Sequence, residues 1–540
     1  MPKWDSLIDE RALASLLPGE QARFAKPVSE GLAVFLAGLP ARHQATILAD
    51  QASLGLSAPI AQRLGMLAKR CPVLHKLGQI LARDQRLSAD FRQYLRQLES
   101  LPPSVPWATI EESLSQELGP LDRLGIQLQQ PALAEASVAV VVGYRSGVGT
   151  RKVSLPTDKF SSQGDSSTNQ KQGAQQPGVQ RHGGPQQDGP QQEVPQQGVF
   201  KLLKPEIEQR LALELDLLGQ VGTHLDERCE KLGIPHLHYQ ESFEQVRQKL
   251  GDEIRLDQEQ RTLAQARREY ANMPRVVIPE VLEHCTPRVT AMERIDGVKI
   301  TKHGLQNPRE QNRLAELVVE ALVVRPIFSL QDHALFHSDP HAGNLFYTSD
   351  RRLAILDWSL ASSLDQAQRT AIVQIMLAAL TLDCQGVVAI LEGLSERQEV
   401  DRSALKIVVD SWLRRLRQGH FPGLRWLIGM LDEAVLTARL RVSSELMLFR
   451  KMLHTLEGVV TAIGAEPAVF DKVLCREFLK HFAMEWPKRW FALPNSRRFA
   501  TRLSNADLTG WMLASPATAT RFWWGQLGDL LYSNSKRKPS

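Results

Sequence analysis

The stretch FHSDPHAGNLFY, residues 336–347, gathers side chains that could carry out phosphoryl transfer. Asp339 and Asn344 lie five positions apart within it, and Asp357 follows the apolar run LAIL farther along the chain. Phosphoryl transfer needs a carboxylate near the attacking group, together with an amide and a second carboxylate that hold a divalent metal against the phosphates. Oxygen ligands of these types suit a hard cation such as Mg²⁺. The three residues therefore predict a site for phosphoryl chemistry with bound magnesium.

The order of these residues is that of a kinase catalytic loop, H-x-D-x-x-x-x-N, followed by a metal-binding aspartate. His337 supplies the first position. A structural alternative is an Asp-Pro turn, in which Asp339 caps a helix and Asn344 stabilises the loop. The position of Asp357 after an apolar strand favours the phosphoryl-transfer interpretation. For His341, a phosphate contact and a structural role both stay open.

A nucleotide site of this kind also needs a phosphate-binding lysine on an upstream strand. Lys201 lies in the β-type run GVFKLLKP, alone among apolar neighbours. The alternative is a lysine on an edge strand whose charged head is solvated. Lys204 precedes a proline and is interpreted as a loop residue. Downstream, residues 243–270 are expected to form a helix.

The hydrophobic pattern divides the chain into four parts. Residues 1–125 have helical periodicity, and a strand-rich part follows at 126–298. A Gln-, Gly- and Pro-rich insertion at 146–198 interrupts this part, and its composition predicts disorder. A mostly helical part at 299–485 carries the loops described above. The last part, 486–540, mixes aromatic and basic residues.

The overall composition is typical of a globular protein of two or more domains. The chain has 540 residues, of which 43% are hydrophobic and 23% are charged, and its net charge of +5 gives no case for nucleic acid as a partner. Five cysteines without a CxxC pair argue against a disulfide framework and indicate a reducing compartment. The N-terminus has no signal-peptide pattern, and no apolar run is long enough to span a bilayer. A cytoplasmic protein is expected, with peripheral membrane contact left open.

Several motifs together resemble the UbiB-type family of atypical kinases, whose members assist ubiquinone biosynthesis. The segment KLGQ at 76–79 resembles the family's K-x-G-Q motif, and FHSDPHAGNLF resembles its D-P-H-x-G-N loop. The runs ASVAVVV at 136–142 and VFKLLKP at 199–205 resemble further segments of the family's sequence. The resemblance covers about residues 60–365 and implies an α+β, protein-kinase-like bilobal fold with a helical N-terminal extension and a helical C-terminal region. ATP and Mg²⁺ would bind between the lobes.

The resemblance also implies roles for the residues of the reaction. Lys201 would contact the nucleotide phosphates and pair with Glu259 on the helix that corresponds to αC. Asp339 would be the catalytic-loop carboxylate, while Asn344 and Asp357 would bind the metal.

Further residues would hold the nucleotide, again by resemblance. Met292 and Glu293 would present backbone groups to adenine at the hinge. An alanine-rich loop would replace the usual glycine-rich one. The helical extension would fold over the site. The loop is represented here by Ala136 and Ser137, and the extension by Lys76, Gly78 and Gln79.

The sequence departs from the family pattern at four places, one of which is the long insertion between two of the expected strands. Asp357 is followed by Trp358 and Ser359 instead of Phe-Gly, and the absence of the glycine restricts the backbone there. Val140 replaces a usual glutamine, and Arg255 stands where an aspartate is usual. The principal nucleotide residues are nevertheless all present, which favours a competent site.

We therefore expect an enzyme, an atypical kinase or ATPase that acts in or supports ubiquinone biosynthesis or lipid metabolism. Its expected partners are ATP, a membrane surface or lipid and quinone precursors, and quinone-biosynthesis enzymes. One alternative is a non-catalytic nucleotide-binding scaffold that recruits lipid-pathway enzymes. A second is a small-molecule phosphotransferase, against which the KLGQ segment argues.

The C-terminal part, 486–540, holds five of the ten tryptophans, with Lys and Arg interleaved. Aromatic and cationic side chains together suit the interface of an anionic bilayer. The alternative is a helical tail whose tryptophans pack on the preceding helical lobe.

Overall fold

The computed structural model describes most of the chain. The described residues are 4, 10–17, 19–55, 57–81, 89–97, 105–147, 196–234, 239–240, 243–244, 247, 251, 254–302, 307–395, 400–417 and 422–514. Most of the predicted insertion and the last part of the predicted tail lie outside these residues. The chain forms two compact units, the first comprising Met1–Arg261 and Glu280–Arg294, the second comprising Thr262–Pro279 and Ile295–Ser540.

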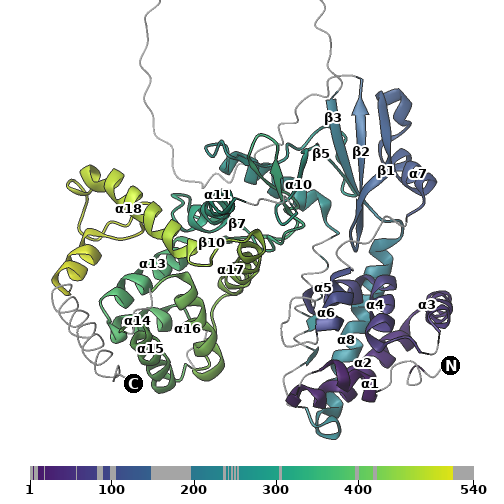
Figure 1. Cartoon of the computed structure of the whole chain (residues 1–540), viewed down its shortest axis with the longest axis horizontal. Coiled ribbons are helices and arrows are strands. Elements are labelled where there is room, and N and C mark those ends of the chain that lie inside the picture. The colour runs from purple at the N-terminus through teal and green to yellow at the C-terminus, as the bar shows by residue number, and fades with distance from the viewer. Residues whose placement is uncertain are drawn as a thin grey trace, which may run out of the picture. The chain divides into compact units, whose positions relative to one another are not determined.

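The first unit contains a four-stranded antiparallel sheet in the order β1-β2-β3-β5 (Figure 1). Its strands are β1 (Ile126–Glu135), β2 (Ala139–Ser146), β3 (Gln196–Leu203) and β5 (Val289–Glu293). The sheet is apolar because β2 and β3 supply buried valines and aromatic rings, among them Tyr144 stacked on Phe200 at 4.1 Å. A Cβ at Gly198 would lie 2.5 Å from the Tyr144 ring, so only glycine fits opposite that tyrosine.

Helices make up the rest of the first unit. They are α1 (Glu10–Leu16), α2 (Ala25–Gly38), α3 (Ala41–Ser53), α4 (Ile60–Arg70), α5 (Pro72–Leu81), α6 (Ala89–Gln97), α7 (Trp107–Leu118) and α8 (Ile207–Leu232). Helix α7 covers the sheet, and α2 runs along α8 (Figure 1). Along α8, buried residues recur every three or four positions, which gives this helix one long apolar face. A Cβ at Gly38 would meet the side chain of Leu217, so the glycine permits close packing of α2 on α8.

Helix α10 (Leu256–Glu269) begins in the first unit and ends in the second. The predicted single helix over 243–270 is wrong, because residues 254 and 255 are not helical. The fully buried Leu256 begins α10, and the carbonyl of Arg255 accepts the backbone N–H groups of Gln258 and Glu259. The new helix therefore starts close to Glu259.

The strands of the second unit form two small sheets. One has the order β4-β9-β8-β6, and the other pairs β10 with β7. Their bounds are β4 (Val276–Val277), β6 (Gly297–Lys299), β7 (Ala334–His337), β8 (Leu345–Thr348), β9 (Leu353–Ile355) and β10 (Ala361–Leu364). These short strands carry the loops in which the expected catalytic and metal-binding residues lie.

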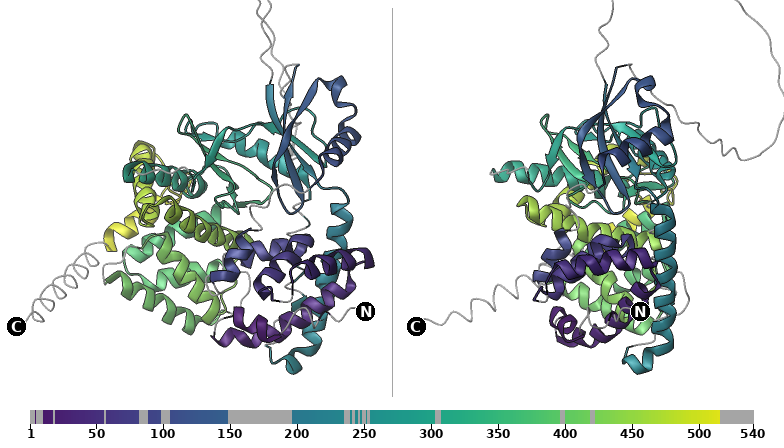
Figure 2. Two further views of the ribbon diagram at one scale, coloured as in Figure 1. Left: turned by 45° about the vertical axis from the view of Figure 1, so that its right-hand side comes forward. Right: turned by 90° about the vertical axis from the view of Figure 1, so that its right-hand side faces the viewer.

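The remaining elements of the second unit are helical. They are α11 (Pro308–Val319), the π-helix η5 (Glu320–Val324), α12 (Arg325–Ile327), α13 (Gln366–Leu380), α14 (Cys384–Gly393), α15 (Arg402–Arg417), α16 (Leu424–Thr437), α17 (Ser444–Ile463) and α18 (Val469–Arg489). Helices α13 to α16 pack on one another in succession (Figure 2). None of the helices within the described ranges is long and apolar enough to cross a bilayer. The predicted α+β class is confirmed.

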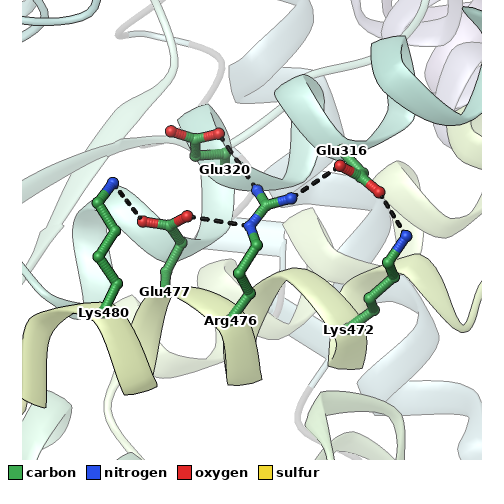
Figure 3. Close-up of polar contacts among 6 residues, drawn as sticks. All are labelled: Glu316, Glu320, Lys472, Arg476, Glu477 and Lys480. Carbon is green, nitrogen blue, oxygen red and sulfur yellow. Dashed lines mark hydrogen bonds and ion pairs between the residues drawn. The ribbon is translucent and has the colours of Figure 1, made fainter. Parts of the chain in front are cut away.

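A chain of charges fastens α18 to α11 and η5 (Figure 3). Arg476 lies at its centre, and its guanidinium contacts Glu316 at 2.8 Å, Glu477 at 3.1 Å and Glu320 at 3.6 Å. Lys472 contacts Glu316 at 2.7 Å and Lys480 contacts Glu477 at 3.0 Å, which extends the network at both ends. These basic groups lower the pKa values of Glu316 and Glu477, against the opposing effect of burial.

Candidate functional site

The expected metal ligands Asn344 and Asp357 leave the same end of one hairpin. Strands β8 and β9 are antiparallel, with Leu345 opposite Ile355. One step beyond, the Leu356 N–H donates to the Asn344 carbonyl at 2.8 Å. Because the ladder continues to these residues, Asn344 and Asp357 emerge close together from adjacent strands.

His337 connects the loop of Asp339 to this hairpin. The Asp339 N–H donates to His337 Nδ1 at 3.2 Å, so the ring proton is on Nε2, which lies 3.1 Å from the Leu356 carbonyl. The imidazole is fully buried, and this burial lowers its pKa below the usual value, which favours the neutral form. His337 thus holds the loop of Asp339 against the residue that precedes Asp357.

The side chains of both expected ligands are oriented by neighbours. Asn344 Nδ2 lies 3.3 Å from the Asp339 carbonyl, which leaves the amide oxygen as the atom that suits a metal. Asp357 has φ 53°, a left-handed conformation that is uncommon for aspartate, and its Oδ1 accepts the Ser359 hydroxyl at 2.6 Å.

An amide and a carboxylate fit magnesium, which takes one or two protein carboxylates and completes its shell with phosphates and water. Asn344 and Asp357 are the residues that would hold it. Clusters of three or more His, Cys, Asp or Glu suited to a metal are not found in the part of the chain that the structure describes.

Trp358 fills the position after Asp357, the expected metal ligand. The indole is completely buried, and its Nε1–H donates to the Ile355 carbonyl at 3.2 Å. Its ring makes edge contacts with His337, at 5.1 Å, and with Tyr270, at 5.8 Å. The departure from the family pattern therefore fills the core beneath Asp357 without an unsatisfied polar group.

His341 shapes the turn between Asp339 and Asn344. Its Nδ1 accepts the Gly343 N–H at 3.0 Å, and its carbonyl accepts the Asn344 N–H at 2.9 Å. A Cβ at Gly343 would lie 2.6 Å from the imidazole, so the glycine makes room for the ring. Of the two alternatives for His341, these contacts support the structural one.

In the first unit, Lys201 and Glu259 form a buried ion pair. Lys201 Nζ lies 2.8 and 2.9 Å from the two carboxylate oxygens of Glu259, and the residues are 7% and 3% exposed. Strand β3 pairs with β2 on one side and β5 on the other, which excludes the alternative of an edge-strand lysine. Gln260 fastens α10 to the sheet, since its Nε2 donates to Thr290 Oγ1 and to the Val289 carbonyl. An ion pair so deeply buried costs desolvation, so it marks a candidate functional site.

The alanine-rich turn lies between β1 and β2. Ala136 N–H donates to the Ala139 carbonyl at 2.8 Å, and Ser137 is buried. Lys204, which follows β3 directly, forms an ion pair with Glu135 at 2.7 Å. This ion pair joins the end of β1 to the end of β3.

The two expected hinge residues end strand β5. Met292 lies opposite Val199 in the sheet. Glu293 accepts the Glu280 N–H with its carboxylate at 3.2 Å, and its own N–H donates to the Glu280 carbonyl at 2.8 Å.

Helix α5 carries the KLGQ segment. Lys76 is half-buried and Gly78 is buried, while the side chain of Gln79 lies outside the described residues. Glu214 of α8 anchors the start of this helix by accepting the Val73 N–H at 3.0 Å. Burial raises the pKa of Glu214 to about 7.

The candidate residues thus form two groups, one in each unit. The first unit brings Lys201 and Glu259 together, and the second gathers Asp339, Asn344 and Asp357. Two further contacts were not predicted from the sequence. Ser359 contacts Asp357, and Lys451 lies 3.7 Å from Asp339. Lys451 lies in a helix more than a hundred residues farther along, so spacing could not have revealed it.

Known proteins resemble this chain over parts of its length. Residues 192–391 match the ABC1 atypical kinase-like domain. A probable protein kinase UbiB of Cellvibrio japonicus is 26% identical over 329 residues, or 55% of this chain and 57% of the relative. Another of the same name, from Shewanella piezotolerans, is 25% identical over 410 residues, or 72% of this chain and 64% of the relative. The chloroplastic protein ACTIVITY OF BC1 COMPLEX KINASE 3 of Arabidopsis thaliana is 26% identical over 32% of this chain and 24% of its own length.

Each of these alignments covers less than two thirds of the relative's length. Among solved structures, the complex of Rv3197 with erythromycin from Mycobacterium tuberculosis aligns with a TM-score of 0.44 and 16% identity. That alignment covers 72% of this chain and 87% of the other.

Proposed function

Since the chain belongs to the UbiB-type family of atypical kinases and has its kinase-like α+β domain, we propose that it binds ATP with Mg²⁺ and transfers or hydrolyses the terminal phosphate. The predicted family and fold are confirmed by the domain match. The observation that best supports the activity is the buried Lys201–Glu259 ion pair, because a kinase-like nucleotide site uses such a pair to place its phosphate-binding lysine.

Each charged residue has a distinct role in this proposal. Lys201 binds the nucleotide phosphates and Glu259 holds its ammonium in place. Asn344 and Asp357 bind the magnesium, which neutralises phosphate charge. Asp339 orients the acceptor hydroxyl or water and accepts its proton.

The remaining predicted residues would hold the nucleotide. Met292 and Glu293 would offer backbone groups to adenine, and Ala136 and Ser137 would lie over the phosphates. The KLGQ residues Lys76, Gly78 and Gln79 would cover the site from the helical extension. This cover would exclude large protein substrates and admit only small ones.

We place this activity in ubiquinone or other isoprenoid-lipid metabolism, because of the family and of the UbiB name that several relatives carry. The acceptor would be water, a lipid or a quinone precursor, and enzymes of quinone biosynthesis would be partners.

Peripheral contact with an anionic membrane is a second part of the proposal. The end of α18 and the segment after it expose Trp490 (74%), Phe491 (94%) and Leu493 (78%) to solvent. Lys488 and Arg498 are exposed nearby. Large rings beside cationic groups favour the lipid interface, so vesicles containing anionic lipid should retain the wild type in co-sedimentation and lose a Trp490→Ser/Phe491→Ser variant. Equal retention of both proteins would refute this surface.

Thermal stability with and without Mg-ATP tests the nucleotide site directly. A ligand that binds only the folded protein raises its melting temperature. We expect Mg-ATP to stabilise the wild type, and Asp357→Asn to lose the magnesium-dependent part of that shift. If no nucleotide raises the melting temperature of the wild type, the proposed nucleotide site is refuted. The better hypothesis is then a non-catalytic scaffold that works without nucleotide. If nucleotide binds but no phosphate is released, the nucleotide-binding scaffold that recruits lipid-pathway enzymes is favoured instead. Transfer to a small soluble hydroxyl compound would favour the small-molecule phosphotransferase.

A further inference from the structure

A cationic side chain from a distant helix lies beside the expected catalytic carboxylate. Lys451 Nζ is 3.7 Å from Asp339 Oδ1, and both residues belong to the second unit. Asp339 is only 7% exposed, whereas the Lys451 side chain is 44% exposed. The pair therefore joins a buried carboxylate to an ammonium that solvent, or a ligand, can reach.

The packing of α17 explains why Lys451 reaches this loop. Phe449 of α17 contacts Phe336 of β7 edge-on, with ring centroids 5.3 Å apart. Phe336 lies three residues before Asp339. Ser443 caps the helix by accepting the Leu446 N–H. Because the cap and the aromatic contact hold the first turns of α17, the position of Lys451 is determined by the core.

The loop itself has no lysine or arginine that could place a positive charge beside Asp339. Residues 337–344, HSDPHAGN, contain neither lysine nor arginine. When a terminal phosphate approaches a catalytic aspartate, two anionic groups come together in a site from which water is partly excluded. Fixed positive charge at such a place stabilises the transition state more than the ground state. Lysine suits this role because its ammonium is a compact charge on a flexible stem.

We propose that Lys451 is a positioning residue of the phosphoryl-transfer site, which orients the Asp339 carboxylate and offsets its charge as the phosphate approaches. This inference rests on the proposed function. In the step, the acceptor O–H gives its proton to Asp339 while its oxygen forms a bond to the terminal phosphorus. The bond from that phosphorus to the bridging oxygen breaks, and ADP leaves with the electron pair. Lys451 keeps its proton throughout.

A simple surface ion pair is the competing explanation, and such pairs contribute little. The two explanations differ in turnover. Removing the charge of a positioning residue should lower kcat, whereas losing a surface pair should leave kcat unchanged.

The test compares Lys451→Met, Lys451→Gln and Lys451→Arg in the full chain. The matched control is Lys472→Met, which removes an exposed lysine and its ion pair with Glu316 in the same unit (Figure 3). The measurements are melting temperature, kcat and KM for Mg-ATP, from phosphate release. We expect both neutral variants to lose about tenfold to a hundredfold in kcat with little change in KM or melting temperature. Lys451→Arg should retain most of the activity, and Lys472→Met all of it.

Two failures can be told apart. If the wild type releases no phosphate, the proposed enzyme activity fails and the role of Lys451 fails with it. If the wild type turns over and both neutral Lys451 variants match Lys472→Met, the enzyme stands and this inference is overturned. A fall in kcat that arginine does not restore would also overturn it, because charge alone would then not explain the effect.

Discussion

The buried pair of Lys201 and Glu259 allows a quantitative test of the first unit. Replacing Lys201 with methionine keeps most of the side-chain volume but leaves the Glu259 carboxylate in a site where it is 3% exposed. Breaking a buried pair by removing one partner costs about 3–5 kcal/mol, because the remaining charge is uncompensated. Replacing both residues with apolar ones is expected to be close to neutral, since no buried charge is left. Lys201→Met should therefore be less stable than the double variant Lys201→Met/Glu259→Met.

Local hydrogen exchange is the appropriate assay, because a chain of two compact units need not unfold in one step. Protection should fall in β3 and in the first turns of α10 for Lys201→Met, and should return in the double variant. Arg261→Met is the matched control, because Arg261 forms an exposed pair with Asp257 at 3.6 Å on the same helix. Such a pair contributes about 0–1 kcal/mol.

The outcome that refutes this reasoning is a Lys201→Met variant that loses no more protection than Arg261→Met. The pair would then be screened by solvent, and burial could not be used as a sign of function. A double variant that is as unstable as Lys201→Met would show instead that the methionine packs badly in the sheet. Both Lys201 variants should lose the thermal shift with Mg-ATP, whatever their stability, because neither retains the phosphate-binding ammonium.

Three further predictions concern other polar contacts of the two units. The pKa of Glu214 is raised from 4.5 to about 7, so its contribution to stability is complete below pH 4.5 and is lost as the pH rises through 7, at up to about 1.4 kcal/mol per pH unit. The free energy of unfolding in urea should fall less with pH between these values for Glu214→Gln than for the wild type. Equal slopes of unfolding free energy against pH would contradict the prediction. Ser359→Ala should weaken magnesium binding about tenfold by releasing the Asp357 carboxylate, measured by magnesium titration of the ATP-dependent thermal shift, and an unchanged midpoint would contradict this role. Arg476→Met should lower protection in α18 by at most about 1 kcal/mol, because Glu477 keeps Lys480 and Glu316 keeps Lys472, and a larger loss in hydrogen exchange would contradict this prediction.

The family was predicted from motifs that resemble it, and the kinase-like fold from that resemblance, while local patterns predicted individual strands. The valine-rich run before residue 146 and the run around Lys201 have the period and composition of strands, and both are strands of one sheet. The spacing of Asp339, Asn344 and Asp357 was informative for a related reason. Asn344 and Asp357 come together through the β8–β9 ladder, whereas Asp339 follows β7 of the other sheet and is joined to them by short-range hydrogen bonds of His337 and Asn344.

Other parts of the site depend on contacts between distant segments, which no local pattern encodes. Lys451 reaches Asp339 because an aromatic contact places α17 on β7. Glu214 anchors the KLGQ helix from α8, far along the chain, and in the sequence it is one glutamate on a helix face. The helix expected over 243–270 is interrupted for a similar reason, since burial of Leu256 and not propensity decides where α10 begins.

The DWS segment bears most directly on whether the site is active. The loss of the family's glycine would matter if the residue after Trp358 had to take a left-handed conformation, but the left-handed residue here is Asp357 itself, with φ 53°. Ser359 therefore costs no backbone strain, and its hydroxyl holds one carboxylate oxygen of Asp357. Trp358 packs fully buried against His337, the residue that joins the loop of Asp339 to the segment before Asp357. These contacts show that the DWS segment accommodates the left-handed Asp357 and buries Trp358 with its indole N–H satisfied.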